Sequence, residues 1–189
     1  MELVLVIAGG IALLCLVIVM AMYNSLVGLK NSIKESWADI DVQLKRRYDL
    51  IPNLVNTVKG YAQHEKETLE KVINARDQAL ANTGRYASQA ADEGRMLNAV
   101  KTLFAVVEKY PELKADENFL KLQQELVDTE DKIAAARRFF NGNVRDYNNK
   151  AQMFPSNIIA NLFGYLPEEF FEVEDDAVRK AVKVELTTN

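Results

Sequence analysis

The chain has little cysteine and histidine, and this scarcity argues against most metal and redox chemistry. Its 189 residues include one cysteine, Cys15, which can form no disulfide within the chain, and one histidine, His64. A closed zinc site needs several such ligands, and a di-metal site in a four-helix bundle needs two Glu-x-x-His motifs. We therefore predict no metal site and no catalytic residues that depend on a histidine.

Signatures of nucleotide binding are also missing. The sequence contains neither a phosphate-binding loop nor a dinucleotide fingerprint, and no basic face is interleaved with stacking aromatics. We therefore predict no cofactor, no nucleic acid partner and no enzymatic activity. An enzyme that uses a carboxylate pair in a helical groove is the alternative, which bound metal in the purified protein would support.

Charge is absent from the twenty residues between Leu3 and Met22. At a rise of about 1.5 Å per residue, a helix of this length reaches about 30 Å, the thickness of a bilayer core. We therefore predict a transmembrane helix over Leu3–Met22, within an anchor of residues 1–25. A cleaved signal peptide, with Val19–Ala21 as a weak cleavage site, is the main alternative, although it would want basic residues ahead of the run. A lipoprotein signal would need a small residue ahead of Cys15, where Leu14 stands.

The residues that flank this run predict its orientation. No Lys or Arg precedes it, whereas Lys30 and Lys34 follow within the range of the positive-inside rule. We therefore place the N-terminus outside, and the rest of the chain in the cytoplasm, at the cell's inner (plasma) membrane. The small residues between Ala8 and Ala12 allow two anchors to approach closely, although lipid-facing filler is the simpler interpretation.

After the anchor, apolar residues recur at steps of three and four, which predicts helices. The stripe of the first long segment contains Ile33, Trp37, Ile40, Leu44, Tyr48, Ile51, Val55, Val58 and Ala62. The stripe of the last contains Phe119, Leu122, Leu126, Thr129, Ile133, Ala136, Phe140, Val144, Tyr147, Ala151 and Phe154. Between them we expect helices to about Leu80, with Leu80 inward, and from about Gln89 to Tyr110. The prediction is an all-α fold: one transmembrane helix, then an up-and-down four-helix bundle over residues 26–154.

Local signals refine these boundaries. Pro52 predicts a kink, and the first two helices of the bundle either alternate in direction or form one kinked rod. Asp116 is the expected N-cap of the last long helix. Beyond Pro155, Ser156 or Asn157 is expected to cap a short helix over residues 158–163 that closes at Gly164.

Several segments from Tyr23 onward match one known family in order: WADIDVQLKRRYDLIPNLVNTVKGYAQHE (37–65), YPELKADENFL (110–120), IAAARRFFN (133–141) and FPSNIIANLFG (154–164). With these segments the chain resembles the LemA family of bacterial membrane-anchored helical proteins. The resemblance implies a long four-helix bundle on one membrane pass, N-terminus outward, with no established catalytic chemistry. Relatives are associated with membrane zinc metalloproteases and, in magnetosome-forming bacteria, with a specialised membrane, which implies a scaffold or adaptor.

An apolar segment follows the last long helix, within residues 155–172. Too many apolar side chains gather there for a solvated tail, so we predict a surface for a partner or for self-association. Its residues, counted from the end of the preceding stripe, are Phe154, Ile158, Ile159, Leu162, Phe163, Tyr165, Leu166, Phe170 and Phe171. Three docking places are open: a groove on its own helices, a neighbouring copy, or the membrane interface. Residues 173–189 form an acidic tail, predicted to be mobile.

Two arginine pairs form a second candidate surface, namely Arg46 with Arg47 and Arg137 with Arg138. They either dock an acidic partner or lipid phosphates, or pair with carboxylates on neighbouring helices while their stems cover the core. The leading hypothesis is a membrane-anchored, non-enzymatic scaffold that self-associates into a homo-oligomer through its coiled-coil-like cytoplasmic bundle. The alternative is a monomeric adaptor that presents the arginines to a membrane metalloprotease or another envelope protein.

Overall fold

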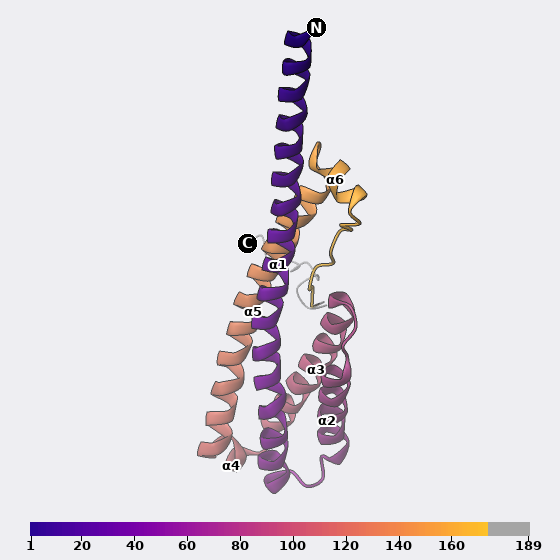
Figure 1. Cartoon of the computed structure of the whole chain (residues 1–189). Coiled ribbons are helices and arrows are strands. Elements are labelled where there is room, and N and C mark those ends of the chain that lie inside the picture. Colours follow the sequence, from indigo (N-terminus) through magenta and orange to yellow (C-terminus); the bar gives the residue numbers. More distant parts are fainter. Residues whose placement is uncertain (174–189) are drawn as a thin grey trace, which may run out of the picture. The chain divides into compact units, whose positions relative to one another are not determined.

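The computed structural model describes residues 1–173, and every regular element in that range is a helix (Figure 1). The helices are α1 (Glu2–Tyr61), α2 (Lys66–Ala81), α3 (Tyr86–Val107), α4 (Pro111–Lys114), α5 (Glu117–Gln152) and α6 (Ser156–Leu162). The all-α prediction is confirmed, but six helices occupy the described residues rather than one anchor and four bundle helices. Apart from Val173, the predicted acidic tail lies outside the described residues.

The predicted anchor and the first predicted bundle helix are one uninterrupted helix, α1, with Pro52 inside it. Every side chain from Met1 to Ala21 is exposed, and cover by other residues begins at Met22. Among the described residues α1 is the one helix long and apolar enough to cross a membrane. Its apolar part therefore continues into the folded part of the chain without a linker.

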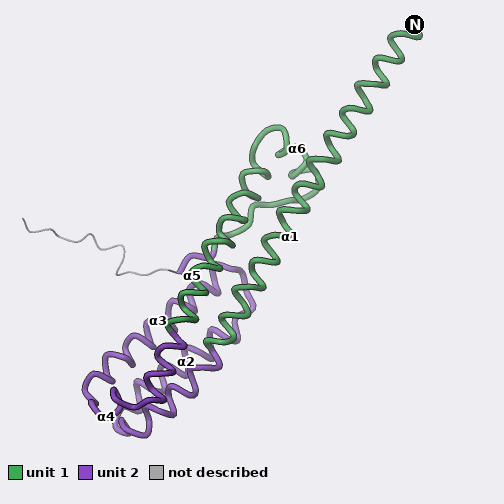
Figure 2. The backbone as a smooth tube through the Cα atoms, turned by 90° about the vertical axis from the view of Figure 1, so that its left-hand side faces the viewer, with its two compact units in different colours: residues 1–47, 127–170 green, residues 48–126, 171–189 purple. Residues whose placement is uncertain are grey.

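The chain divides into two compact units, drawn in different colours in Figure 2. Of the described residues, unit 1 comprises 1–47 and 127–170, and unit 2 comprises 48–126 together with 171–173. Both α1 and α5 cross the boundary, so each contributes one part to each unit.

Unit 2 is organised around an apolar cluster. Its buried side chains come from α1, α2, α3, α4 and α5 and include Ile51, Val58, Leu69, Val72, Leu103, Leu113 and Phe119. Because Leu69 and Val72 of α2 join the same cluster as Leu54 and Val58 of α1, α2 folds back on α1 after the turn at 62–65. The first two helices are therefore not one rod. Leu80, predicted to point inward, is exposed near the end of α2.

The helix ends confirm some local signals and correct others. Asp116 caps α5, since its Oδ1 accepts a hydrogen bond from the Phe119 N–H at 2.9 Å, and this bond lowers the pKa of Asp116. The third helix was expected to reach Tyr110, but α3 ends at Val107, and Pro111 starts the one-turn helix α4. Ser156 is the first residue of α6 and does not cap it. Its hydroxyl donates instead to the carbonyls of Lys150 and Met153.

In unit 1, α1 and α5 pack side by side in opposite directions. Three contacts follow one another along the pair of helices. Arg47 pairs with Glu130, the ring centroids of Trp37 and Phe140 lie 5.5 Å apart, and Asn143 Nδ2 donates to the Ser32 carbonyl at 3.2 Å. Because the residue numbers fall along α1 as they rise along α5, the C-terminal end of α5 lies beside the membrane-proximal residues of α1. The chain after α5 therefore meets α1 where its apolar run ends.

Candidate functional site

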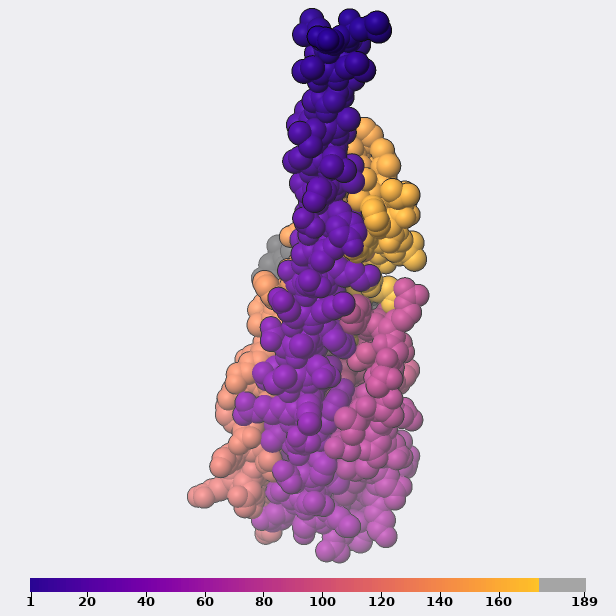
Figure 3. Space-filling model, in the orientation of Figure 1, coloured from indigo at the N-terminus to yellow at the C-terminus, as the bar shows by residue number. Residues whose placement is uncertain are grey.

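The segment after α5 folds back against α1 immediately beyond the predicted membrane span. Tyr23, the residue after Met22, has its ring centroid 4.9 Å from that of Phe163 and 5.9 Å from that of Tyr165. Figure 3 shows this part of the surface, in orange and yellow, directly beside α1. We call residues 154–168 with Tyr23 and Lys30 the membrane-proximal site.

Polar groups of α5 hold the segment at two points. The Tyr147 hydroxyl donates to the Leu166 carbonyl at 2.9 Å. Asn148 makes a two-way contact with Glu168: its Nδ2 donates to the Glu168 carbonyl at 2.9 Å, and its Oδ1 accepts from the Glu168 N–H at 2.8 Å. Burial, assisted by the nearby Glu168 carboxylate, raises the pKa of Tyr147 to about 12, so this hydroxyl stays a donor.

Lys30 of α1 adds a third attachment point. Its Nζ lies 3.2 Å from a Glu168 carboxylate oxygen and 5.8 Å from the centroid of the Tyr165 ring. The hydrogen bond between Tyr165 and Tyr23 raises the pKa of Tyr165, with burial as the second cause. The segment thus has a defined position on α1 and α5, one of the three docking places expected for it.

The predicted apolar residues of the segment divide into two groups. Ile159 and Phe171 are buried and Tyr165 is partly covered, as docking on the chain itself requires. The remaining six leave much of their surface exposed: Phe154, Ile158, Leu162, Phe163, Leu166 and Phe170. Phe154, predicted to end the buried stripe of α5, is 80% exposed because α5 stops at Gln152. Docking on its own helices therefore uses only part of this apolar surface.

The arginine pairs are not equivalent. Arg47 is 3% exposed and forms an ion pair with Glu130 of α5. Its prediction as a surface residue is therefore wrong, and the alternative, pairing with a carboxylate on a neighbouring helix, holds for it. Arg46 and Arg138 are exposed, and Arg137 is half-buried. The signal that separates Arg47 is its position on the apolar stripe, three residues after Leu44.

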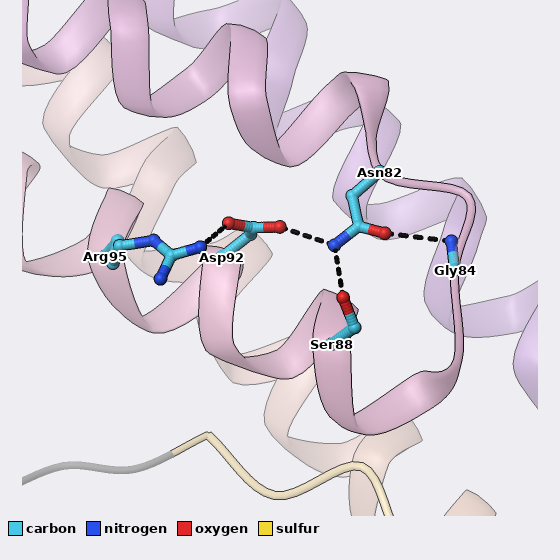
Figure 4. A network of polar contacts seen from close by, with 5 residues as sticks. All are labelled: Asn82, Gly84, Ser88, Asp92 and Arg95. Carbon is cyan, nitrogen blue, oxygen red and sulfur yellow. Dashed lines mark hydrogen bonds and ion pairs between the residues drawn. The ribbon is translucent and has the colours of Figure 1, made fainter.

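A polar network that the sequence patterns did not reveal joins α2 to α3 in unit 2 (Figure 4). Asn82 Nδ2 donates to Ser88 Oγ at 2.9 Å and to the buried Asp92, which also pairs with Arg95. Asn82 Oδ1 accepts the Gly84 N–H at 2.8 Å, an Asx turn that closes the loop. A Cβ at Gly84 would lie 2.9 Å from that oxygen, which explains the glycine.

A second buried polar contact lies deeper in unit 2. The Tyr48 hydroxyl donates to the carboxylate of Glu93, and both residues are buried. Arg76 Nε donates to the Tyr48 carbonyl at 3.2 Å. Tyr48 was expected in the apolar stripe, but Glu93 gave no signal, because a single acidic residue on a helix usually indicates a solvated face.

A groove on the surface also belongs to unit 2. It has a volume of about 510 Å³, and its walls are the end of α1 and the first half of α2. Lys59, Lys66 and Glu70 line it together with Val55, Leu69 and Ile73, a mixture without a convergent catalytic set. His64 is exposed in the neighbouring turn, and residues 1–173 contain no group of ligands that could hold a metal ion.

Comparison with known proteins adds a family model and several relatives. The model described as the LemA family matches residues 36–186. The magnetosome protein MamQ of Magnetospirillum gryphiswaldense is 25% identical over 174 residues, which cover 79% of this chain and 64% of the relative. The protein LemA of Metamycoplasma hominis is 28% identical over 138 residues, 72% of this chain and 63% of the relative. The chain therefore spans slightly less than two thirds of the length of these relatives.

Proposed function

The chain belongs to the LemA family, and from this premise we propose that it is a non-enzymatic, membrane-anchored scaffold that self-associates into a homo-oligomer through its cytoplasmic helices. The observation that carries the proposal is the continuity of α1, whose exposed apolar part and folded part are one helix without a linker. A helix transmits the position of the membrane to the folded residues rigidly, whereas a flexible linker would not. Rigid placement suits a protein that holds other molecules at a membrane.

The proposed arrangement has its N-terminus outside and the rest of the chain in the cytoplasm, at the inner membrane. Lys30 and Lys34 follow the apolar run, which supports this orientation by the positive-inside rule. The four longer helices, α1, α2, α3 and α5, would form the up-and-down bundle, with α4 and α6 as short additions to it.

Self-association is proposed to use apolar side chains that α1 and α5 leave exposed in unit 1. Phe139 is 63% exposed although its neighbour Phe140 is buried, and Val42 is likewise exposed on α1. Anchoring confines copies to one plane and raises their effective concentration, so a modest apolar contact suffices to assemble them. The occupant proposed for this surface is a second copy of the chain.

Light scattering of the nanodisc-held, full-length protein tests this proposal. We expect a uniform mass of several copies, which Phe139→Asp combined with Val42→Asp reduces to one copy while far-UV circular dichroism stays unchanged. Leu120→Asp, at an exposed apolar position on the same helix in unit 2, is the matched control and should leave the mass unchanged. A single-copy mass for the wild type would refute self-association.

The location of the contact needs a further comparison. A version that lacks Met1 to Met22 should still assemble if the contact lies in the cytoplasmic helices. Assembly of the full-length protein alone would place it in the anchor instead, where Gly9 and Gly10 leave room for a close approach.

A specific observation also favours the adaptor as a second candidate. Arg46 and Arg138 are exposed in unit 1, where they are free to meet an acidic partner such as a membrane metalloprotease. Crosslinking in native membranes separates the two functions, because a scaffold gives mainly self-crosslinks and an adaptor gives mainly crosslinks to another protein. Loss of the foreign crosslink in an Arg46→Glu, Arg138→Glu variant would identify the arginines as the contact.

A further inference from the structure

The exposed apolar face of the membrane-proximal site is unusual for a surface in water. Leu162 is 74% exposed, and Phe154, Ile158, Phe163 and Leu166 also leave more than half of their surface uncovered. No charged residue occurs from Ala151 to Pro167, the stretch that supplies this face. A group of exposed apolar side chains without a charge among them marks a binding or membrane-contact surface.

The face lies at the depth where the anchor leaves the bilayer. Tyr23 follows the last apolar residue of the predicted span, a position that tyrosines prefer at membrane interfaces. Phe163, part of the exposed face, lies against Tyr23 with its ring tilted and 4.9 Å between the ring centroids. Figures 1 and 2 both place α6 beside α1, directly below the length of α1 that stands alone.

We propose that residues 154–166 form a second membrane-contact element, which inserts this face into the headgroup and acyl-chain boundary of the bilayer that α1 crosses. The occupant is lipid of that same membrane. Helices at this boundary bury their apolar faces about 5–10 Å deep. Ile159 and Ala160 form the face of α6 that is buried against the protein. Packing within the chain therefore does not account for the apolar residues Ile158 and Leu162, which are exposed.

Two observations favour lipid over a second copy of the chain. First, the face is continuous with the anchor through Tyr23, so lipid is its neighbour as soon as α1 spans the membrane. Second, the segment is held before any partner arrives, since Tyr147, Asn148 and Lys30 attach it to α5 and α1. A prearranged element orders few residues on contact, so insertion costs little conformational entropy.

The consequence is attachment at two points, which restricts the tilt and rotation of α1. A single spanning helix is free to rotate about its axis, whereas a helix with a lateral wedge presents one fixed side of the folded part to the membrane. This goes beyond the proposed scaffold and does not depend on self-association.

The test uses full-length protein in phosphatidylcholine vesicles with or without bromine on the acyl chains. Leu162→Trp in a Trp37→Phe background places the only indole on the proposed face, at an exposed position that accepts a large side chain. Val127→Trp in the same background is the matched control, at another exposed apolar position in unit 1 that the proposed self-association does not use. Brominated lipid should quench the Leu162→Trp emission by about two-fold and leave the Val127→Trp emission unchanged.

A second pair of variants keeps Trp37 intact, in case its replacement disturbs the packing on Phe140. Leu162→Cys and Val127→Cys, each in a Cys15→Ser background, are labelled with the fluorophore NBD and treated with dithionite outside the bilayer. Protection at 162 and reduction at 127 supports the proposal. Rapid reduction at both positions would overturn the proposal, and so would the absence of quenching in the first experiment. Protection at 162 that disappears when the number of protein copies per vesicle is lowered would also overturn it, in favour of a protein neighbour.

Discussion

Unit 1 and unit 2 share the helices α1 and α5, yet they differ in what they leave exposed. Unit 2 closes an apolar cluster with side chains from five helices and leaves few large apolar groups outside. Unit 1 also buries apolar side chains, such as Ile33, Ile40 and Phe140, and adds polar contacts: Arg47 with Glu130, Asn143 with Ser32, Asn148 with Glu168 and Tyr147 with Leu166. It leaves apolar side chains exposed on the first third of α1 and on residues 154–166.

The difference shows that a single helix, α1, can serve two environments. Along α1 the buried positions continue from Leu26 to Val58 at helical spacing, while residues 3–21 are apolar on all sides. A helix that is apolar all round needs a surrounding apolar phase, whereas a striped helix needs one packed face. The proposed lipid contact of residues 154–166 extends the first requirement from the anchor to unit 1.

The largest effect should come from removing a core aromatic of unit 2. Phe119 is 2% exposed and packs edge-on against Phe104, with 6.0 Å between ring centroids. Phe119→Ala should lower the free energy of unfolding by about 3–5 kcal/mol, because it loses apolar burial and leaves a cavity. Urea denaturation of the micelle-held protein, followed by far-UV circular dichroism, measures this loss.

Phe139→Ala is the matched control on the same helix. Since Phe139 is mostly exposed in unit 1, its truncation should change the free energy of unfolding by within about 0.5 kcal/mol. Comparable losses for the two variants would break the comparison, because the surface of unit 1 would then contribute as much packing as the core of unit 2.

A smaller effect is expected from the buried polar contact of unit 2. Tyr48→Phe removes the hydroxyl that donates to Glu93, and both residues are buried. The free energy of unfolding should fall by about 1–3 kcal/mol, because the carboxylate loses a donor where water is scarce. Tyr61 lies on the same helix as Tyr48, and its hydroxyl donates to Asp116 at an exposed position. Tyr61→Phe, which removes this exposed hydrogen bond, should have a clearly smaller effect. The reverse order would show that the core of unit 2 does not depend on this contact.

The corresponding polar contact in unit 1 gives a dependence on pH. The pKa of Tyr147 rises to about 12 in the folded protein, against about 10 when unfolded. Its neutral form is therefore favoured by folding: this contribution is complete below pH 10 and is lost as the pH rises to 12. Because the hydroxyl is only part-buried, we expect a loss of about 1–2 kcal/mol relative to Tyr147→Phe over that window. Parallel pH profiles of wild type and variant would contradict it.

Helical spacing was sufficient to predict most of the architecture. The stripes place Ile33, Ile40, Val58 and Phe140 in the interior, where they are buried, because periodicity reports which face of a helix avoids water. Asp116 and Gly164 were also identified correctly, since a cap and a positive φ, +72° at Gly164, depend on local chemistry alone.

The errors arise where the answer depends on what another element supplies. Leu80 and Phe154 continue their stripes but lie at helix ends, where no partner covers them. Arg47 and Glu93 are buried because another helix supplies a polar partner: Glu130 pairs with Arg47, and the Tyr48 hydroxyl donates to Glu93. Spacing within one helix carries no information about such partners. For the same reason the sequence identified the apolar segment after α5 but left its docking place open.

The smallest effect tests how far packing limits unit 1. Gly142 lies inside α5, and a Cβ added there meets no atom within 4 Å. Gly142→Ala should therefore raise the free energy of unfolding by about 0.5–1 kcal/mol, since alanine loses less backbone freedom on folding and nothing must move to admit it.

Gly164→Ala is the control of opposite sign, because its φ of +72° is strained for any residue with a Cβ, and it should destabilise the fold by about 1 kcal/mol. Both substitutions add one methyl group to unit 1, so the difference between them isolates backbone conformation from packing. A gain at Gly142 would mean that unit 1 has spare room on α5 and that helix propensity limits its stability there. A loss at both positions would mean that unit 1 is packed as tightly as unit 2. The two units would then differ only in the medium that surrounds their exposed side chains.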